Sequence, residues 1–429
     1  MRRRTLLAAL LLAVAVMVGG CGSHESGALT DQTSAKSKHC SIVNRGRYYD
    51  VVLDYSGGVK PRTLGREYGG LIKRVMPDFE AKADSYLAQL SMNEAMYQIV
   101  LGRIAKLKPQ IDAGYRNEVE GIAAAMSGGA TDVRGDGKLS VNECYALSLV
   151  PDVARTTQCS AVSVFGARSA TGGTITARLF DWTPSPTLAR LQAVTTIRNG
   201  SRSVALIGFL GCQSMITGFS DNGIFAAMLD SPTGYPYPDP TGRRSYAFDL
   251  RHALETTGTI EAAAGYLSTG SRQYCFNHLI LFSDSRRTKV LENDFVSGGP
   301  RARTLRTSKS PLNPGVSWGI GNALGCVNSF VLLGNFDNHT PVPDNTGRWA
   351  SIKRELRAKG SVVTKDQLKA VAAYHANDLQ HPAFSDLYTS WNQMIVIAEP
   401  GTMQYEVAFR PRNNVLPEQP VYTAIQTHF

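Results

Sequence analysis

Cysteine is sparse in this chain of 429 residues, and its spacing argues against several kinds of site. The seven cysteines stand at positions 21, 40, 144, 159, 212, 275 and 326. No two of them form a CxxC pair, which disfavours zinc sites and thioredoxin-like redox sites. Residues 132–143 follow the spacing of a calcium loop, but Arg134 stands where a ligand oxygen is needed. A turn before a helix is the better interpretation, and we expect no metal site.

A concentrated basic region with interleaved aromatic residues, which is typical of nucleic-acid-binding modules, is also missing. The formal net charge is +10, and three of the basic residues lie in the first four positions. The other lysines and arginines are spread along the chain, with the densest groups at 242–244 and 285–287. We expect no nucleic-acid partner, and the sequence leaves the oligomeric state open.

The N-terminal apolar run is shorter than the ~20 residues that cross a bilayer. It follows Arg2, Arg3 and Arg4, and small residues separate it from Cys21. A basic start, a short apolar run and small residues before a cut site are typical of an export signal. The stretch 18–21 resembles the lipobox of bacterial lipoproteins, in which the cysteine is lipidated and begins the mature chain.

This resemblance implies a signal peptide at 1–20, lipidation at Cys21 and a polar tether at 21–39. The protein would be an exported bacterial lipoprotein, anchored to the membrane and facing the periplasm or the cell exterior. Ordinary secretion with an incidental cysteine is the alternative. Export would also permit disulfides, and at most two can form once Cys21 and Cys159 are set aside.

The pattern of the remaining chain changes near Cys159. Apolar residues recur at helical spacing from Tyr68 to Ala124, which predicts a helical N-terminal segment at 40–158. From Cys159 onward, short β-like runs bounded by Gly, Asn, Asp or Pro predict strands, interrupted by helical stretches at 245–267 and 345–360. No internal repeat is present. We therefore expect an α+β catalytic region at 159–429.

Cys159 stands at this boundary, with Arg178 and Asp181 following it at 19 and 22 residues. A cysteine nucleophile needs a base and a group that stabilises the oxyanion, but the papain-type signature is absent here. A cut between Gln158 and Cys159 would free an α-amine with a pKa near ~8, which can act as the base. A β-hairpin would bring Arg178 and Asp181 back beside the cysteine. A buried structural thiol is the simpler alternative.

The motif "ARLFDW" at 177–182 resembles the start of the mature subunit in N-terminal-nucleophile hydrolases. The similarity is to the group of choloylglycine hydrolase and acyl-coenzyme A:6-aminopenicillanate acyltransferase. Arg178, Asp181 and Trp182 match that pattern, whereas Leu179 replaces its asparagine. Further motifs follow in the same order over about 310 residues, among them "VEGIAAAM", "GFSDNG", "FDNHT" and "NTGRWASIKREL". The resemblance implies a four-layer αββα sandwich with a helical N-terminal pro-segment or α-subunit.

The resemblance also implies roles for single residues. Cys159 would be the nucleophile and, through its amine, the base, supported by Arg178 and Asp181. Asn338 would help to form the oxyanion hole, with Asn328 as a second candidate, and Arg348 would be a polar site residue. The family's other oxyanion asparagine falls on Ser220, where Asn222 is a substitute.

Together these features predict a self-cleaving cysteine amide hydrolase or acyltransferase that forms a thioester and needs no cofactor. Its partner would be a small-molecule amide or acyl substrate of unspecified identity. Two alternatives are open. One is a catalytically impaired relative that binds acylated ligands at the cell surface, suggested by Leu179 and Ser220. The other is a cysteine hydrolase without self-cleavage, with His278 or His339 as the base.

Overall fold

The computed structural model describes residues 34–154, 158–200, 202–231, 238–294 and 302–429. The expected signal peptide, the lipidation site Cys21 and most of the expected tether lie outside the described residues. All described elements belong to one unit, Gln32–Phe429. None of the described helices has both the length and the apolar composition that a membrane crossing requires.

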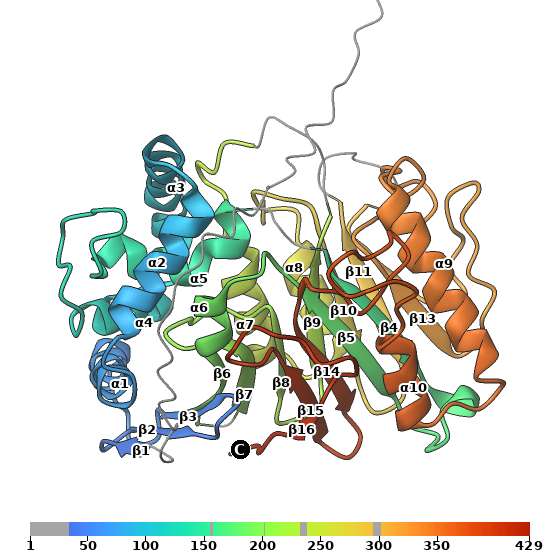
Figure 1. Ribbon diagram of the computed structural model, residues 1–429, viewed down its shortest axis with the longest axis horizontal. Coiled ribbons are helices and arrows are strands. Elements are labelled where there is room, and N and C mark those ends of the chain that lie inside the picture. Colours follow the sequence, from blue (N-terminus) through green and yellow to red (C-terminus); the bar gives the residue numbers. More distant parts are fainter. Residues whose placement is uncertain (1–33, 155–157, 201, 232–237, 295–301) are drawn as a thin grey trace, which may run out of the picture. The chain divides into compact units, whose positions relative to one another are not determined.

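The larger of two β-sheets has ten strands in the described residues (Figure 1). Neighbouring strands are antiparallel, except that β3 and β6 pair in parallel with Tyr49 opposite Ala193. In spatial order the strands are β1 (Ser34–Lys36), β2 (Cys40–Asn44), β3 (Tyr49–Asp54), β6 (Gln192–Asn199), β7 (Arg202–Phe209), β8 (Thr217–Ser220), β9 (Phe225–Asp230), β10 (His278–Ser283), β11 (Thr288–Asn293) and β12 (Thr304–Arg306).

The smaller sheet is antiparallel and carries the predicted hairpin after Cys159. Its order is β13 (Ala323–Cys326), β4 (Ser160–Val164), β5 (Ile175–Asp181), β14 (Asn392–Glu399), β15 (Gln404–Phe409) and β16 (Thr423–Ala424). Every residue of β4, β5 and β14 is buried, so both faces of this sheet are covered. Ala161 and Phe180 face the core between the sheets, whereas Val162 and Leu179 face a second core.

Helices complete a layer on the outer side of each sheet. Ile352 of α9 (Pro343–Ala358) and Leu368 of α10 (Lys365–Ala372) share the second core with Leu179. Leu250 of α7 (Tyr246–Thr256) and Leu267 of α8 (Ile260–Ser268) belong to the core of the larger sheet. The layers are therefore helix, sheet, sheet and helix. The architecture is an αββα sandwich, as expected.

The N-terminal segment is helical over most of its length, but the expectation of a purely helical 40–158 is wrong at its start. Its helices are α1 (Pro61–Val75), α2 (Phe79–Ser91), α3 (Glu94–Leu107), the short 3-10 helix η1 (Lys108–Gln110), α4 (Ala113–Ala123) and α5 (Val141–Val153). Before them, β2 and β3 join the larger sheet, and β1 lies within the range assigned to the tether. Short helices at Gly166–Arg168 (η2) and Pro186–Arg190 (α6) follow β4 and β5.

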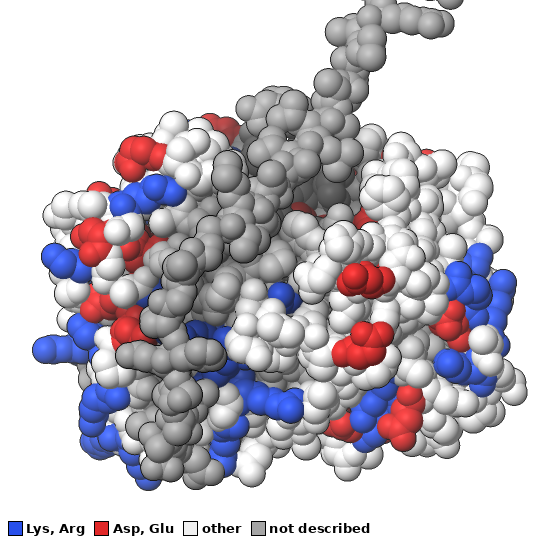
Figure 2. All heavy atoms as spheres, viewed as in Figure 1, with Lys and Arg blue, Asp and Glu red and all other residues white. Residues whose placement is uncertain are grey.

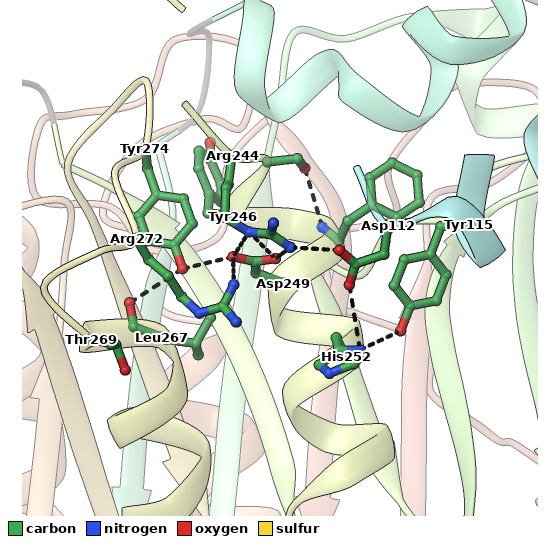
Figure 3. A network of polar contacts seen from close by, with 12 residues as sticks. Asp112, Tyr115, Arg244, Tyr246, Asp249, His252, Leu267, Thr269, Arg272 and Tyr274 are labelled. Atoms are coloured by element: carbon green, nitrogen blue, oxygen red, sulfur yellow. Dashed lines mark hydrogen bonds and ion pairs between the residues drawn. The ribbon is translucent and has the colours of Figure 1, made fainter. Parts of the chain in front are cut away.

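Polar contacts also join the N-terminal segment to α7. Arg251 of α7 donates through Nη2 to Glu118 Oε1 of α4 at 2.8 Å, and both side chains are buried. Asp112, just before α4, accepts from Arg244 Nη2 at 3.1 Å, and Tyr115 Oη lies 3.2 Å from His252 Nδ1 (Figure 3). The segment is thus built into the same sheet and core as residues 159–429.

Candidate active site

Cys159 lies directly before β4, at the point where the chain passes from the surface into the core. Its side chain is buried, whereas the preceding Gln158 is exposed. The hairpin of β4 and β5 pairs Ser160 with Leu179 and Ala161 with Arg178. This register confirms the predicted hairpin and brings Arg178 back beside Cys159, both facing the space between the sheets.

Arg178 is the cation closest to the thiol. It is fully buried, and its Nη2 lies 3.5 Å from Cys159 Sγ while donating to the carbonyl of Met228 at 2.9 Å. Within the described part of the chain, its Nε and Nη1 have no hydrogen-bond partner. The guanidinium carbon lies 4.6 Å from the centre of the Phe180 ring. Arg178 is thus a buried cation with unpaired N–H groups beside the thiol, where it can stabilise a thiolate or an oxyanion.

Opposing effects act on the pKa of the Cys159 thiol. Burial raises its pKa above the ordinary value for cysteine, and the positive charge of Arg178 lowers it. The nearby Asp181 raises it as well, while a hydrogen bond from the Asp181 backbone favours the thiolate. The thiol of the uncut chain is therefore held largely protonated, with the charge that can activate it already in place.

Asn328 and Arg348 hold the backbone of Cys159 from two sides. The Cys159 N–H donates to Asn328 Oδ1 at 2.5 Å, and Arg348 Nη1 donates to the Cys159 carbonyl at 2.7 Å. Arg348 Nη2 also donates to Asn328 Oδ1, at 3.1 Å, and Asn328 Nδ2 donates to the carbonyl of Asp230 at 2.8 Å. All four residues are buried. Both backbone polar atoms of Cys159 are therefore fixed.

Asp181 ends β5 in the same region. Its Oδ1 accepts from Asn392 Nδ2 on β14. Burial raises the pKa of Asp181 to about 7, although the charges of Arg348 and Arg178 act in the opposite direction. The carboxyl group can therefore gain or lose a proton near neutral pH, close to where an α-amine would appear after a cut.

Of the two asparagines considered for the oxyanion hole, Asn328 is hydrogen-bonded to Cys159, and among the described residues no hydrogen bond joins Asn338 to Cys159. Asn338 donates through Nδ2 to Ser231 Oγ at 2.8 Å and accepts from the Phe330 N–H at 2.8 Å. Asn345 links the two, because its Nδ2 donates to the carbonyls of both Asn328 and Asn338. Asn338 thus supports the loop that carries Asn328.

Ser220 and Asn222 are not at this site. Ser220 Oγ donates to Asn222 Oδ1 at the turn between β8 and β9. β9 then runs from Phe225 to Asp230, and at ~3.3 Å per residue its far end lies roughly 17 Å away. Asp230, at that far end, is the residue that shares a cavity with Cys159. The sequence motif placed the candidate at the wrong end of the strand.

A narrow apolar slot leads away from the thiol. A cavity of about 10 Å³ at Cys159 adjoins one of about 30 Å³ and shares Pro151, Phe180, Trp182 and Ile216 with it. Pockets for drug-sized ligands have about 300–1,000 Å³, so both cavities are far smaller than such a pocket. The remaining lining residues of the inner cavity are Ala154, Met228, Asp230 and Tyr246, and those of the outer one are Tyr86, Leu147, Val150, Leu188, Leu191, Phe209, Leu210 and Cys212.

Neither histidine considered as a base is oriented toward the thiol. His278 Nδ1 lies 3.0 Å from the Phe276 carbonyl, and its Nε2 lies 3.0 Å from Asn293 Nδ2. His339 Nδ1 lies 2.7 Å from Ser329 Oγ, and burial lowers the pKa of its ring to about 4. No group of three or more metal-ligating side chains is present among the described residues.

Comparison with known proteins gives a likeness in structure alone. No family model matches the chain, and no curated protein matches it. An N-acylethanolamine-hydrolysing acid amidase orthologue from Caenorhabditis elegans is 14% identical, with a TM-score of 0.39 over 57% of this chain and 93% of that one. Penicillin V acylase from Agrobacterium tumefaciens is 12% identical, with a TM-score of 0.35 over 58% and 83%.

A variant of conjugated bile acid hydrolase from Clostridium perfringens is also similar, at 12% identity and a TM-score of 0.35 over 63% of this chain and 97% of that one. At these identities and TM-scores, the likeness carries no argument about activity. The chemistry has to be argued from the site itself.

Proposed function

We propose that this protein is a cysteine amide hydrolase or acyltransferase that cuts itself between Gln158 and Cys159. One observation carries the proposal: a buried thiol at the start of a strand, 3.5 Å from a buried arginine with two unpaired donors. Two further features favour a cut at that bond. Gln158 is exposed, and Asn328 and Arg348 form hydrogen bonds to the backbone of Cys159.

The self-cleavage would begin with attack of Cys159 Sγ on the carbonyl carbon of Gln158. The bond from that carbon to the Cys159 nitrogen breaks, the nitrogen takes up the thiol proton, and a thioester to Gln158 forms. Water then hydrolyses the thioester, which leaves a carboxylate on Gln158 and a free thiol and α-amine on Cys159. Arg178 would stabilise both the attacking thiolate and the oxyanion.

In the mature enzyme, the α-amine of Cys159 would act as the base for its own thiol. Asp181 and Asn328, which lie on either side, would hold and orient that amine. The thiolate attacks the substrate carbonyl, the protonated amine gives its proton to the leaving amine, and an acyl-enzyme thioester remains. Water or a second amine then accepts the acyl group, so hydrolysis and acyl transfer share every step but the last. No step of this sequence requires a cofactor.

The apolar slot would receive the acyl part of the substrate. Its walls carry no charge except Asp230 beside the thiol, which favours an uncharged acyl group. Tyr86, Leu147 and Val150 come from the N-terminal segment, which would therefore contribute to substrate binding in the mature protein.

The alternative of an impaired relative that binds acylated ligands loses its two supports. Leu179 points into the second core, away from Cys159, and Ser220 lies at the other end of β9. Neither residue therefore supplies one of the side chains that hydrogen-bond Cys159. We also propose export and a lipid anchor at Cys21, for which the sequence of residues 1–21 is the support.

The test is intact-mass analysis of chain 32–429 beside its Cys159→Ala variant and a matched Cys326→Ala control. Cys326 is a buried thiol of the neighbouring strand β13. The expected result is two fragments, the second beginning at Cys159, for the wild type and for Cys326→Ala, and a single chain for Cys159→Ala. A wild type that stays whole would refute self-cleavage. A cut protein that releases no amine from a series of N-acyl amides would refute the hydrolase reading.

A further inference from the structure

The first described part of the chain carries most of its net positive charge. Residues 34–77 contain nine lysines and arginines but only three acids, a net charge of +6, whereas residues 78–429 have +3. No long basic run stands out in the sequence, because these residues occur singly or in pairs. In space they come together over α1 and β1–β3, at the lower left of Figure 2.

Four of these cations, Lys36, Lys38, Arg45 and Arg47, form what we call the basic edge. All four are exposed, and they flank β1 and β2, with β1 as the outermost strand of the larger sheet. The described residues give Lys36 and Lys38 no ion pair. Arg45 Nη2 lies 2.9 Å from Asp50 Oδ2, and Arg47 donates to the Val421 carbonyl at 2.8 Å.

The basic edge also opens into a hollow. A cavity of about 330 Å³ is lined by three of the four cations together with Arg198, His39 and His428. Its two carboxylates, Asp50 and Asp54, are already engaged by Arg45, His428 and Arg198. The hollow shares no residue with the slot at Cys159. It therefore offers unneutralised cations and room for an anionic group, apart from the catalytic machinery.

The position of the basic edge in the chain indicates what it meets. Thirteen residue steps separate Cys21 from Ser34, and at ~3.5 Å per step they span no more than about 45 Å. A lipid on Cys21 would hold the basic edge close to the bilayer surface. Stable membrane binding generally takes two signals, such as an acyl chain and a polybasic surface.

We propose that the basic edge binds the anionic headgroups of membrane lipids and holds the folded body against the bilayer surface. This role is independent of the amide chemistry and adds a second point of attachment to the anchor. Each cation near an anionic surface strengthens binding about fivefold. Lys36 and Lys38 together therefore contribute about thirtyfold, and the effect weakens as salt screens the charges.

The experiment uses the unlipidated chain 32–429, which contains every described element. Its binding to vesicles of equal parts phosphatidylglycerol and phosphatidylcholine is measured by co-sedimentation, with pure phosphatidylcholine vesicles beside them. The variant is Lys36→Ser/Lys38→Ser. The matched control, Lys138→Ser/Lys309→Ser, removes the same charge from two exposed lysines outside residues 34–77. Circular dichroism and size-exclusion chromatography check that all chains are folded and monodisperse.

The proposal expects binding to the anionic vesicles alone, a loss of about thirtyfold in the Lys36→Ser/Lys38→Ser variant and little change in the control. Equal losses in both double variants would overturn it, because net charge and not the basic edge would then be responsible. So would binding to neutral vesicles of the same strength, or no binding at all. Edge lysines also discourage strand pairing between copies. If the Lys36→Ser/Lys38→Ser variant forms oligomers but still binds the vesicles, the lysines serve to prevent strand pairing and the proposal is overturned.

Discussion

The substitution Asp181→Asn should stabilise the uncut chain, and more strongly at high pH than at low pH. Asp181 is buried, and burial raises its pKa from 3.8 to about 7 in the folded chain. An asparagine has nearly the same shape and cannot ionise. Its side-chain oxygen can still accept the hydrogen bond from Asn392. The comparison is made in a Cys159→Ala background, so that no cut occurs.

The size of the effect follows from the two pKa values. A carboxyl group whose pKa is higher in the folded state favours folding below the unfolded pKa, and this contribution is lost as the pH rises through the folded pKa. With 3.8 unfolded and about 7 folded, ionisation of Asp181 costs about 2 kcal/mol of stability at pH 5 and about 4 kcal/mol at pH 8. The advantage of asparagine should therefore grow by about 2–3 kcal/mol between these pH values.

Urea unfolding of the two chains at pH 5 and pH 8 provides the assay. Subtracting the stability gain at pH 5 from that at pH 8 removes the contributions of the other titrating groups, because both chains contain them. A stability gain that is the same at both pH values would refute the reasoning, since it would mean that Asp181 is ionised in the folded chain throughout. In the self-cleaved protein the same substitution should lower activity, because the α-amine loses a charged partner.

Three further outcomes follow from contacts in the structure. Arg251→Met should cost about 3–5 kcal/mol in urea unfolding, because it leaves the buried carboxylate of Glu118 without its partner, whereas Arg287→Met, which breaks a half-exposed pair, should cost less than about 1 kcal/mol. Asn328→Ala should slow amide turnover by about a hundredfold or more, and Asn338→Ala should slow it less; equal effects would refute their assignment. Leu147→Trp should lower kcat/KM for long-chain amides by about tenfold or more and spare N-acetyl amides; uniform loss would contradict the slot.

The hairpin after Cys159 was readable from the sequence because all of its signals are local. Two β-like runs joined by a Gly turn fix the register of β4 and β5, and that register brings Arg178 to the thiol. The two-sheet architecture was expected from the order of motifs, and the later strands confirm it. For the hairpin, residues close together in the sequence determine the structure.

Of the first strands, β1 and β2 pair only with sequence neighbours, and β3 alone also has a partner that is distant in the sequence. β3 pairs with β6, so Tyr49 lies beside Ala193 across more than a hundred residues. No local sequence pattern indicates such a parallel pairing. In addition, β1 has only three residues. The polar, lysine-bearing sequence around β1 resembles a tether and forms an edge strand.

The prediction for Ser220 was wrong because a sequence motif gives the position of a residue in the chain but not its position in the folded sheet. The family pattern aligned "GFSDNG" with an oxyanion asparagine, but that stretch forms the turn before β9, and the site lies after it. Asp230 could have been found by asking which polar residue ends the strand that follows the turn. The choice between Asn328 and Asn338 needed the register of β13 and β4, which places Asn328 just beyond the pair of Cys326 and Ala161.

The parallel pairing of β3 with β6 has a consequence for how often this protein can fold. A cut after Gln158 would leave one sheet shared by two separate polypeptides, with β1–β3 on one and the other strands on the second. Before the cut, pairing is intramolecular; after it, each molecule that unfolds has to find a fragment by diffusion. Recovery from denaturant should then depend on protein concentration, whereas the uncut Cys159→Ala chain should recover at a rate independent of it. Maturation would make folding a one-time event, and the lifetime of the cut protein would be set by its unfolding rate.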